Sequence, residues 1–281
     1  MEQPAFPKLD LGDLERYRVC SGGKGATLAD IPASDDKGFP FDKKEAQAAT
    51  ADDVAAIDRL QDILYAEGRR AILIILQGMD ASGKDGTIRK VFGPIDPLGI
   101  TASNFKKPAG DELAHDYLWR IHKAVPPARM IGIFNRSHYE DVVTVGVLGL
   151  VPPERIEQRY QQINDFERHL AWNDVTILKF FLHISKDEQK KRLQERLGIP
   201  EKRWKFSPDD LAARSRWDSF AAAYETALDR CSTRWAPWFI VPADRKWYRN
   251  AVIARIVRMT LEAMDLSYPA EMPGLDRMRI E

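Results

Sequence analysis

The sequence AILIILQGMDASGKDGTIR, at residues 71–89, decides the fold. It opens with an apolar, partly β-branched run bounded by a glycine, a pattern typical of a strand buried on both faces. Gly78, four further residues and then Gly83-Lys84 give the G-x-x-x-x-G-K spacing of a phosphate-binding loop. The glycines let backbone N–H groups converge on an anion, and Lys84 places a positive charge beside it. A helix predicted to begin near Gly83 directs its N-terminal dipole at the same point.

Two carboxylates set this loop apart from the common one. Asp85 stands where Ser or Thr usually holds Mg²⁺, and Asp80 lies inside the loop. These positions predict that the metal is held differently from the usual NTPase arrangement. A chance glycine turn is the alternative, but the preceding strand and the helix-compatible run that follows favour a phosphate loop. A second glycine-rich sequence, at residues 21–25, has no preceding strand and predicts only a flexible turn.

Length and composition bound the possible classes of protein. The 281 residues suffice for one large α/β domain with insertions or for two small domains. Acidic and basic residues number 42 each, so no global charge draws the chain to nucleic acid or to an anionic membrane. Cys20 and Cys231 have no metal-like spacing, and the N-terminus lacks the features of a signal peptide. We therefore predict a soluble cytoplasmic protein with no membrane or nucleic-acid partner.

Apolar strands and amphipathic helices alternate along the chain. Further strands are predicted at residues 100–105, 129–134, 175–184 and 238–241, with helices at 111–124, 152–170, 208–231 and 252–261. A capping box at Asp42 and Glu45 begins another helix before the first strand. This order predicts a three-layer α/β P-loop kinase fold, with a parallel sheet flanked by helices. The predicted organisation is an irregular arm over residues 1–40, the kinase domain over 41–265 and a tail over 266–281.

A densely basic segment at residues 185–212 predicts a helical lid. Ser185 and Glu188 form a capping box, and the helix that follows has a thin apolar stripe of Leu193 and Leu197. The basic residues of this helix and of the turn after it include Arg192, Arg196, Lys202, Arg203 and Lys205. A poorly buried basic hairpin between two strands of a sheet is typical of a lid. The alternative is a solvated charged face.

Two polar sequences directly follow predicted strands. Residues 135–141 come after the third strand, at the expected position of a metal-binding carboxylate in a phosphoryl-transfer fold. The first of them, Asn135, cannot ionise, and His138 is expected to form hydrogen bonds at a helix start rather than to act as a base. Lys106 and Lys107 end the second strand, at the edge of a parallel sheet where ligands gather.

Several sequence strings together resemble the polyphosphate kinase 2 family. They are Gln77–Gly86, Phe105–Pro108, Tyr117–Arg120, Phe134–Asp141 and Trp238–Arg249. The resemblance implies Mg²⁺-dependent transfer of phosphoryl groups between inorganic polyphosphate and adenine or guanine nucleotides, by direct in-line displacement without a phospho-enzyme. It also accounts for Asp85 in place of Ser or Thr. A single catalytic domain with Glu140 resembles the class III subgroup, which phosphorylates both AMP and ADP, and we expect a homo-oligomer.

The resemblance assigns roles to individual residues. Catalysis falls to Asp80, Lys84, Arg136 and Glu140, with Asp80 and Asn135 at the metal. Nucleotide and phosphate groups would bind at Gly78, Ala81, Ser82, Gly83, Asp85, Gly86, Lys106, Lys107 and Asn135. Apart from the resemblance, their positive charge predicts that polyphosphate binds at Arg120, Lys123, Arg192, Arg196, Lys202, Arg203 and Lys205. Asn135 stands where many members have Asp, and Glu140 where ADP-preferring relatives commonly have Asn.

Two other functions stay open from the residues alone. An ATP-dependent nucleotide or small-molecule kinase would share the fold and the lid. A non-catalytic nucleic-acid-binding P-loop protein would use the basic hairpin, with Trp204 and Phe206 as stacking surfaces. The neutral net charge and the catalytic type of the loop weigh against this last function.

Overall fold

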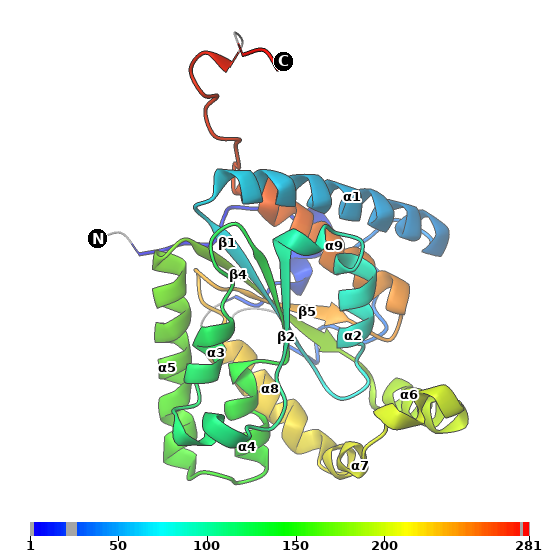
Figure 1. The fold of residues 1–281 in the computed structure, drawn as a ribbon. Helices are drawn as coiled ribbons and strands as arrows, with labels where there is room; N and C mark the ends of the chain where they lie inside the picture. The colour runs from blue at the N-terminus through cyan, green and yellow to red at the C-terminus, as the bar shows by residue number, and fades with distance from the viewer. Residues whose placement is uncertain (1–2, 21–26, 276–277, 281) are drawn as a thin grey trace.

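A five-stranded parallel sheet forms the centre of the molecule (Figure 1). The computed structural model describes residues 3–20, 27–275 and 278–280, so the turn predicted at residues 21–25 lies outside the described residues. The strands are β1 (Ala71–Gln77), β2 (Ile100–Asn104), β3 (Ile131–Asn135), β4 (Val175–His183) and β5 (Trp238–Pro242), in the order β2-β3-β1-β4-β5. Every residue of β1 is buried, as expected of the central strand of a parallel sheet that is covered on both faces.

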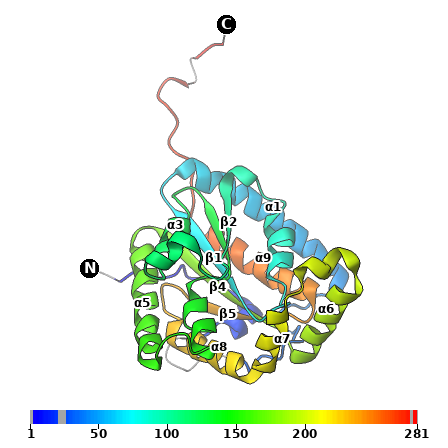
Figure 2. The ribbon, with the colours of Figure 1, turned by 60° about the horizontal axis from the view of Figure 1, so that its bottom comes forward.

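Helices cover both faces of this sheet, so the predicted three-layer α/β fold is confirmed. The longer helices are α1 (Lys43–Glu67), α5 (Pro153–Trp172), α6 (Lys186–Gly198), α7 (Pro208–Ser215), α8 (Trp217–Cys231) and α9 (Lys246–Ala263). Figures 1 and 2 show α1 and α9 side by side on one face and α5 and α8 on the other, with α6 and α7 beyond the ends of the strands. In the described part of the chain, no helix has both the length and the apolarity to cross a bilayer.

Short helical segments fill the connections. The α-helical ones are α2 (Lys84–Thr87), α3 (Trp119–Ala124) and α4 (Thr144–Val147), and η2 (Ile88–Phe92) is a π-helical turn. The 3-10 turns are η1 (Gly12–Tyr17), η3 (Pro97–Gly99), η4 (Gly110–Ala114), η5 (His138–Asp141) and η6 (Pro200–Lys205). The capping box predicted for α1 is present, because Asp42 accepts from the N–H of Glu45 at 2.9 Å and Glu45 accepts from the N–H of Asp42 at 3.0 Å.

Two helices that were predicted as continuous are interrupted. In the first, over residues 111–124, the carboxylate of Asp116 accepts a hydrogen bond at 2.9 Å from the backbone N–H two residues later. This local turn competes with the helix, so α3 begins only at Trp119. In the second, over residues 208–231, the hydroxyl of Ser215 donates to a backbone carbonyl three residues earlier at 2.7 Å. Such back-bonding bends a helix, and the chain breaks between α7 and α8.

The N-terminal arm packs against β5 and α9 of its own chain. The backbone N–H of Val19 donates to the carbonyl of Trp238 at 2.9 Å. The hydroxyl of Tyr17, which is fully buried, lies 2.6 Å from that of Tyr248 and donates to Asp35 at 2.7 Å. The arm is therefore part of the hydrophobic core.

A fully buried ion pair lies between β4 and α5. The ammonium of Lys179 is 2.5 Å from the carboxylate of Glu167, and it also donates to the hydroxyl of Tyr139 at 2.9 Å and to the carbonyl of Cys231 at 2.7 Å. Burial lowers the pKa of Lys179. Burial alone would raise the pKa of Glu167, but Lys179 and His138 lower it below its usual value. Because Tyr139 and His138 belong to η5, this pair holds in place the segment that follows β3.

Glu167→Ala should destabilise the protein by about 3–5 kcal/mol, because it leaves a buried ammonium without its counterion. The free energy of unfolding from urea titration measures the loss. The double change Lys179→Met with Glu167→Gln should recover most of it, since no charge is then buried. Glu195→Ala, at an exposed position of α6, is the control. A loss for Glu167→Ala no larger than that of the control would contradict this account.

Candidate active site at the phosphate loop

The phosphate loop, residues 78–83, connects the end of β1 to α2. Gly78 has φ +147° and Gly83 has φ +109°, in the region that favours glycine. Packing also requires both glycines. An ideal Cβ at Gly78 would lie 2.7 Å from the carbonyl oxygen of Leu182, and one at Gly83 would lie 1.9 Å from Nη1 of Arg249. The spacing that the sequence shows therefore reflects close packing from behind the loop as well as backbone conformation.

Lys84 is folded back over this loop. Its Nζ donates to the carbonyl of Gly78 at 2.7 Å and to that of Met79 at 3.3 Å, and the residue is 7% exposed. Burial and the neighbouring Arg136 lower the pKa of Lys84 to about 8, although nearby carboxylates oppose them. The ammonium is thus charged at neutral pH and poorly hydrated, which makes it a strong partner for a phosphate oxygen.

Arg136 joins the end of β3 to the phosphate loop. Its backbone N–H donates to the carbonyl of Leu76 at 3.0 Å, and its φ of +63° turns the chain toward β1. The guanidinium lies 2.5 Å from the carboxylate of Asp80 and 3.4 Å from that of Glu140. Burial alone would lower the pKa of Arg136, but these two carboxylates raise it above its ordinary value. The structure thus brings the four predicted catalytic residues together at the carboxyl edge of the sheet.

Two residues that the sequence reasoning missed hold Glu140. The hydroxyl of Thr144 donates to one carboxylate oxygen at 2.5 Å. The side-chain amide of Gln77 finds hydrogen-bond partners for both of its atoms in one orientation. Its nitrogen then donates to the other carboxylate oxygen of Glu140 at 3.1 Å, and its oxygen accepts from the hydroxyl of Ser137 at 3.1 Å. A signal for Gln77 was present in the sequence, because a polar residue ends an otherwise apolar buried strand.

Asn135 and Asp85 form a second polar pair beside the loop. The amide of Asn135 donates to the carboxylate of Asp85 at 2.8 Å, so the two unusual residues of the sequence contact each other. Among the residues that the structure describes, no group of three or more His, Cys, Asp or Glu side chains is arranged to hold a metal on its own. Any divalent metal here would need oxygen ligands from the substrate as well.

The predicted lid corresponds to α6, η6 and α7, but Arg192 does not face its surface. It is 6% exposed, and its guanidinium donates to backbone carbonyls of the phosphate loop. The prediction that Arg192 binds polyphosphate is therefore wrong, because this side chain is buried against the loop and not exposed on the lid. Lys202 and Arg203 are exposed, Arg196 is partly exposed and lies 3.4 Å from Asp210, and the side chain of Lys205 lies outside the described part.

The basic residues predicted near the end of β2 and in α3 also divide into exposed and buried side chains. Lys106, Lys107 and Lys123 are exposed, and the ammonium of Lys123 lies 4.1 Å from the ring centre of Trp119. Arg120 is 8% exposed and donates to the carbonyl of Lys106 at 2.7 Å. Arg120 therefore holds the end of β2 and is not available to polyphosphate as predicted.

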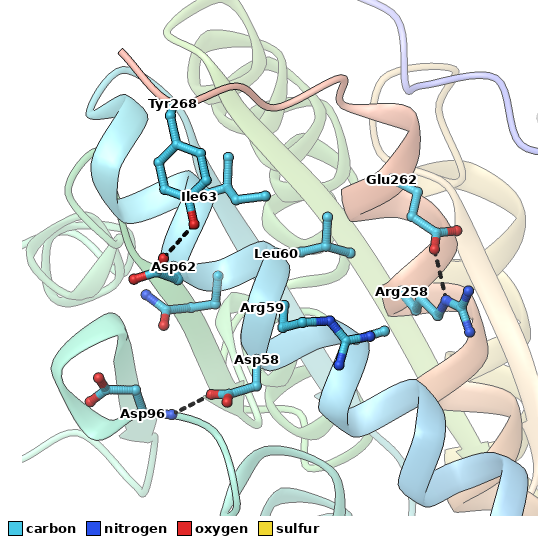
Figure 3. Close-up of a pocket in the computed structure, with 11 residues that line it drawn as sticks. Asp58, Arg59, Leu60, Asp62, Ile63, Asp96, Arg258, Glu262 and Tyr268 are labelled. Atoms are coloured by element: carbon cyan, nitrogen blue, oxygen red, sulfur yellow. Dashed lines mark hydrogen bonds and ion pairs between the residues drawn. The ribbon is translucent and has the colours of Figure 1, made fainter. Parts of the chain in front are cut away.

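A pocket of about 610 Å³ lies elsewhere, between α1, α9 and η3 (Figure 3). Its lining includes four carboxylates, Asp58, Asp62, Asp96 and Glu262, against two arginines, Arg59 and Arg258, and none of the predicted site residues. A lining with more acidic than basic side chains disfavours a polyanion, so this pocket is not the candidate active site.

Comparisons with known proteins also indicate a phosphotransferase. The family model described as Polyphosphate kinase 2 matches residues 40–269. An AMP/ADP-polyphosphate phosphotransferase of Meiothermus ruber is 47% identical over 95% of this chain and 100% of its own. An ADP-polyphosphate phosphotransferase of Rhodopseudomonas palustris is 39% identical over 92% of this chain and 93% of its own.

A solved structure extends the agreement to three dimensions. The crystal structure of polyphosphate kinase 2 from Arthrobacter aurescens has a TM-score of 0.89 to this fold, at 41% identity, and the match covers 95% of each chain. These similarities favour a phosphotransferase over a non-catalytic nucleic-acid-binding protein. The chain belongs to the polyphosphate kinase 2 family and is an enzyme of its phosphotransferase type.

Proposed function

We propose that this enzyme transfers phosphoryl groups between inorganic polyphosphate and both AMP and ADP. The observation that carries the proposal is the gathering of Lys84 and Arg136 around the same two carboxylates, Asp80 and Glu140. Two neighbouring cations suit a phosphoryl group that accumulates negative charge during transfer. The similarity to an enzyme named AMP/ADP-polyphosphate phosphotransferase supports the choice of substrates.

In-line transfer of a phosphoryl group requires little covalent chemistry from the protein. The loop N–H groups would bind the phosphates, and Lys84 and Arg136 would stabilise the charge that develops between donor and acceptor. His138 is fully buried beside Glu167, and burial lowers its pKa, so it is neutral and closed off from the site. This supports direct transfer without a phospho-enzyme.

The oxygen-rich side chains of the site fit Mg²⁺. Asp80 would hold the metal together with phosphate oxygens of the substrate, and the pair of Asn135 and Asp85 lies beside it. The bound metal would neutralise phosphate charge and fix the geometry of transfer. The carboxylate of Asp80 also pairs with Arg136, so the residue that would hold the metal lies beside the cation that would bind the phosphoryl group.

Polyphosphate would extend from the loop between two basic surfaces. One is the lid, with Arg196, Lys202 and Arg203, and the other holds Lys106, Lys107 and Lys123. The homo-oligomer, the cytoplasmic location and the use of guanine nucleotides stay predictions.

Lys84→Ala should lower kcat by about 100- to 1000-fold, because it removes a fixed charge at the developing anion. Initial rates with polyphosphate and ADP measure the loss, and thermal unfolding checks the fold. The matched control is Lys90→Ala, an exposed lysine of η2, which should keep its activity. Near-normal turnover of Lys84→Ala would remove this residue from the site.

Asp80→Asn should lower activity at least about tenfold, and added Mg²⁺ should restore little of it, since the best-placed anionic ligand is lost. The rate is measured against Mg²⁺ concentration for wild type, Asp80→Asn and Asp85→Asn. A normal Mg²⁺ dependence of Asp80→Asn, together with a loss in Asp85→Asn, would move the metal to the side of Asn135.

Glu140→Asn should reduce phosphorylation of AMP more than that of ADP. AMP is shorter, so its attacking oxygen lies deeper, and a carboxylate that orients a water or metal there would matter less for ADP. The measurement is kcat/KM for both acceptors with one polyphosphate donor.

Thr144→Val, which removes one hydrogen bond to Glu140, should change the same ratio in the same direction by less. An equal fall for both acceptors would give Glu140 a general role. A wild-type enzyme inactive with AMP, or inactive with polyphosphate but active with ATP as donor, would contradict the proposed function.

A further inference from the structure

Two buried arginines contact the backbone of the phosphate loop. Arg192 of α6 is 6% exposed and Arg249 of α9 is 2% exposed. Nη1 of Arg192 donates to the carbonyls of Ala81 at 3.0 Å and Ser82 at 3.1 Å. Nη1 of Arg249 donates to the same carbonyl of Ser82 at 3.1 Å. The loop carbonyls are therefore bonded to guanidinium groups that come from two distant helices.

These bonds fix which way the loop peptides point. In a trans peptide the N–H lies opposite the C=O. Holding the carbonyl of Ser82 toward the arginines therefore turns the N–H of Gly83 away from them. Gln189 orients an earlier peptide of the loop in the same way, since its side-chain amide donates to the carbonyl of Asp80 at 3.0 Å.

Arg249 is packed against the loop without room to spare. An ideal Cβ at Gly83 would lie 1.9 Å from its Nη1, and one at Gly86 would lie 3.4 Å from its Nη2. Its remaining donors, Nε and Nη2, both bond the side-chain oxygen of Asn250, at 3.2 and 2.9 Å. The guanidinium therefore lies directly against the loop, at the carbonyl of Ser82 and beside Gly83.

Among the residues that the structure describes, no carboxylate forms an ion pair with Arg249. Burial, and then the charge of Arg192, lower the pKa of Arg249 to about 9. A guanidinium nevertheless keeps its proton at neutral pH. An uncompensated buried charge is unfavourable in the free protein and becomes favourable when an anion approaches.

We propose that Arg249, together with Arg192, is a positioning residue of the phosphate loop: it orients the peptide between Ser82 and Gly83 and supplies positive charge from behind the bound phosphate. The inference rests on the proposed function, because the anion is the phosphate of polyphosphate or of the nucleotide. Arg192 also donates to the carbonyls of Ala243 and Asp244, both at 2.8 Å, so the first helix of the lid, the loop and the end of β5 form one unit.

Arg249→Met separates this role from an ordinary structural one. The matched control is Arg255→Met on the same helix, where the guanidinium pairs with Asp53 at 2.8 Å. Thermal unfolding is measured without ligand and with inorganic tripolyphosphate, and kcat and KM with polyphosphate and ADP.

For Arg249→Met we expect an unliganded Tm no more than about 2 °C below wild type, because a buried unpaired charge is removed. The rise in Tm caused by tripolyphosphate should fall to less than half of the wild-type rise. The ratio kcat/KM should fall at least about tenfold, with part of the loss in kcat. Arg255→Met should show the opposite pattern, with a lower unliganded Tm but a normal tripolyphosphate effect and normal kcat.

A wild-type tripolyphosphate effect and kcat/KM in Arg249→Met would overturn the inference. If that variant does not fold, Arg249→Lys decides, because lysine keeps the charge but lacks the planar fork whose separate nitrogens bond Ser82 and Asn250. A loss of kcat of about tenfold is expected for Arg249→Lys, and wild-type kcat would overturn the inference. A wild-type protein whose Tm does not respond to tripolyphosphate would contradict the proposed function itself, and with it this inference.

Discussion

The contact of Arg136 with Asp80 and Glu140 is the interaction on which the site depends. Asp80 belongs to the phosphate loop after β1, whereas Arg136 and Glu140 follow β3, so the contact joins the ends of two neighbouring strands. These carboxylates hold the guanidinium of Arg136 at the end of β3, where a phosphate group would meet it. A cation fixed in this way needs little reorganisation during transfer.

Features encoded by neighbouring residues could be predicted from the sequence. The phosphate loop is one of them, because the spacing of Gly78, Gly83 and Lys84 is a local requirement of its backbone. The strands are another, because a parallel sheet with both faces covered needs continuous apolar runs. The helix breaks near Asp116 and Ser215 escaped prediction because a single side-chain hydrogen bond overrides an otherwise helical pattern.

The residues that the sequence misplaced depend on contacts between distant segments. Helical periodicity indicates that a face of α6 is thinly apolar, but it cannot show that Arg192 reaches the loop and the end of β5. Arg120 is similar, since its position depends on where β2 ends. Both were assigned to polyphosphate because a long cationic side chain was expected at the surface. The sequence alone does not distinguish a surface arginine from a buried one that donates to backbone carbonyls.

The parallel order of the sheet has a consequence for how the protein forms during synthesis. Strand β1 pairs with β3 and β4, which are made much later, and the phosphate loop is backed by Arg249 from the last helix. Contacts of such long sequence separation form slowly. The nascent chain therefore carries its most apolar strand before any partner strand exists, and the phosphate loop gains its last buttress only when α9 has been made. Binding of phosphate is in this sense a property of the completed domain, and β1 stays without a partner strand until β3 has been made.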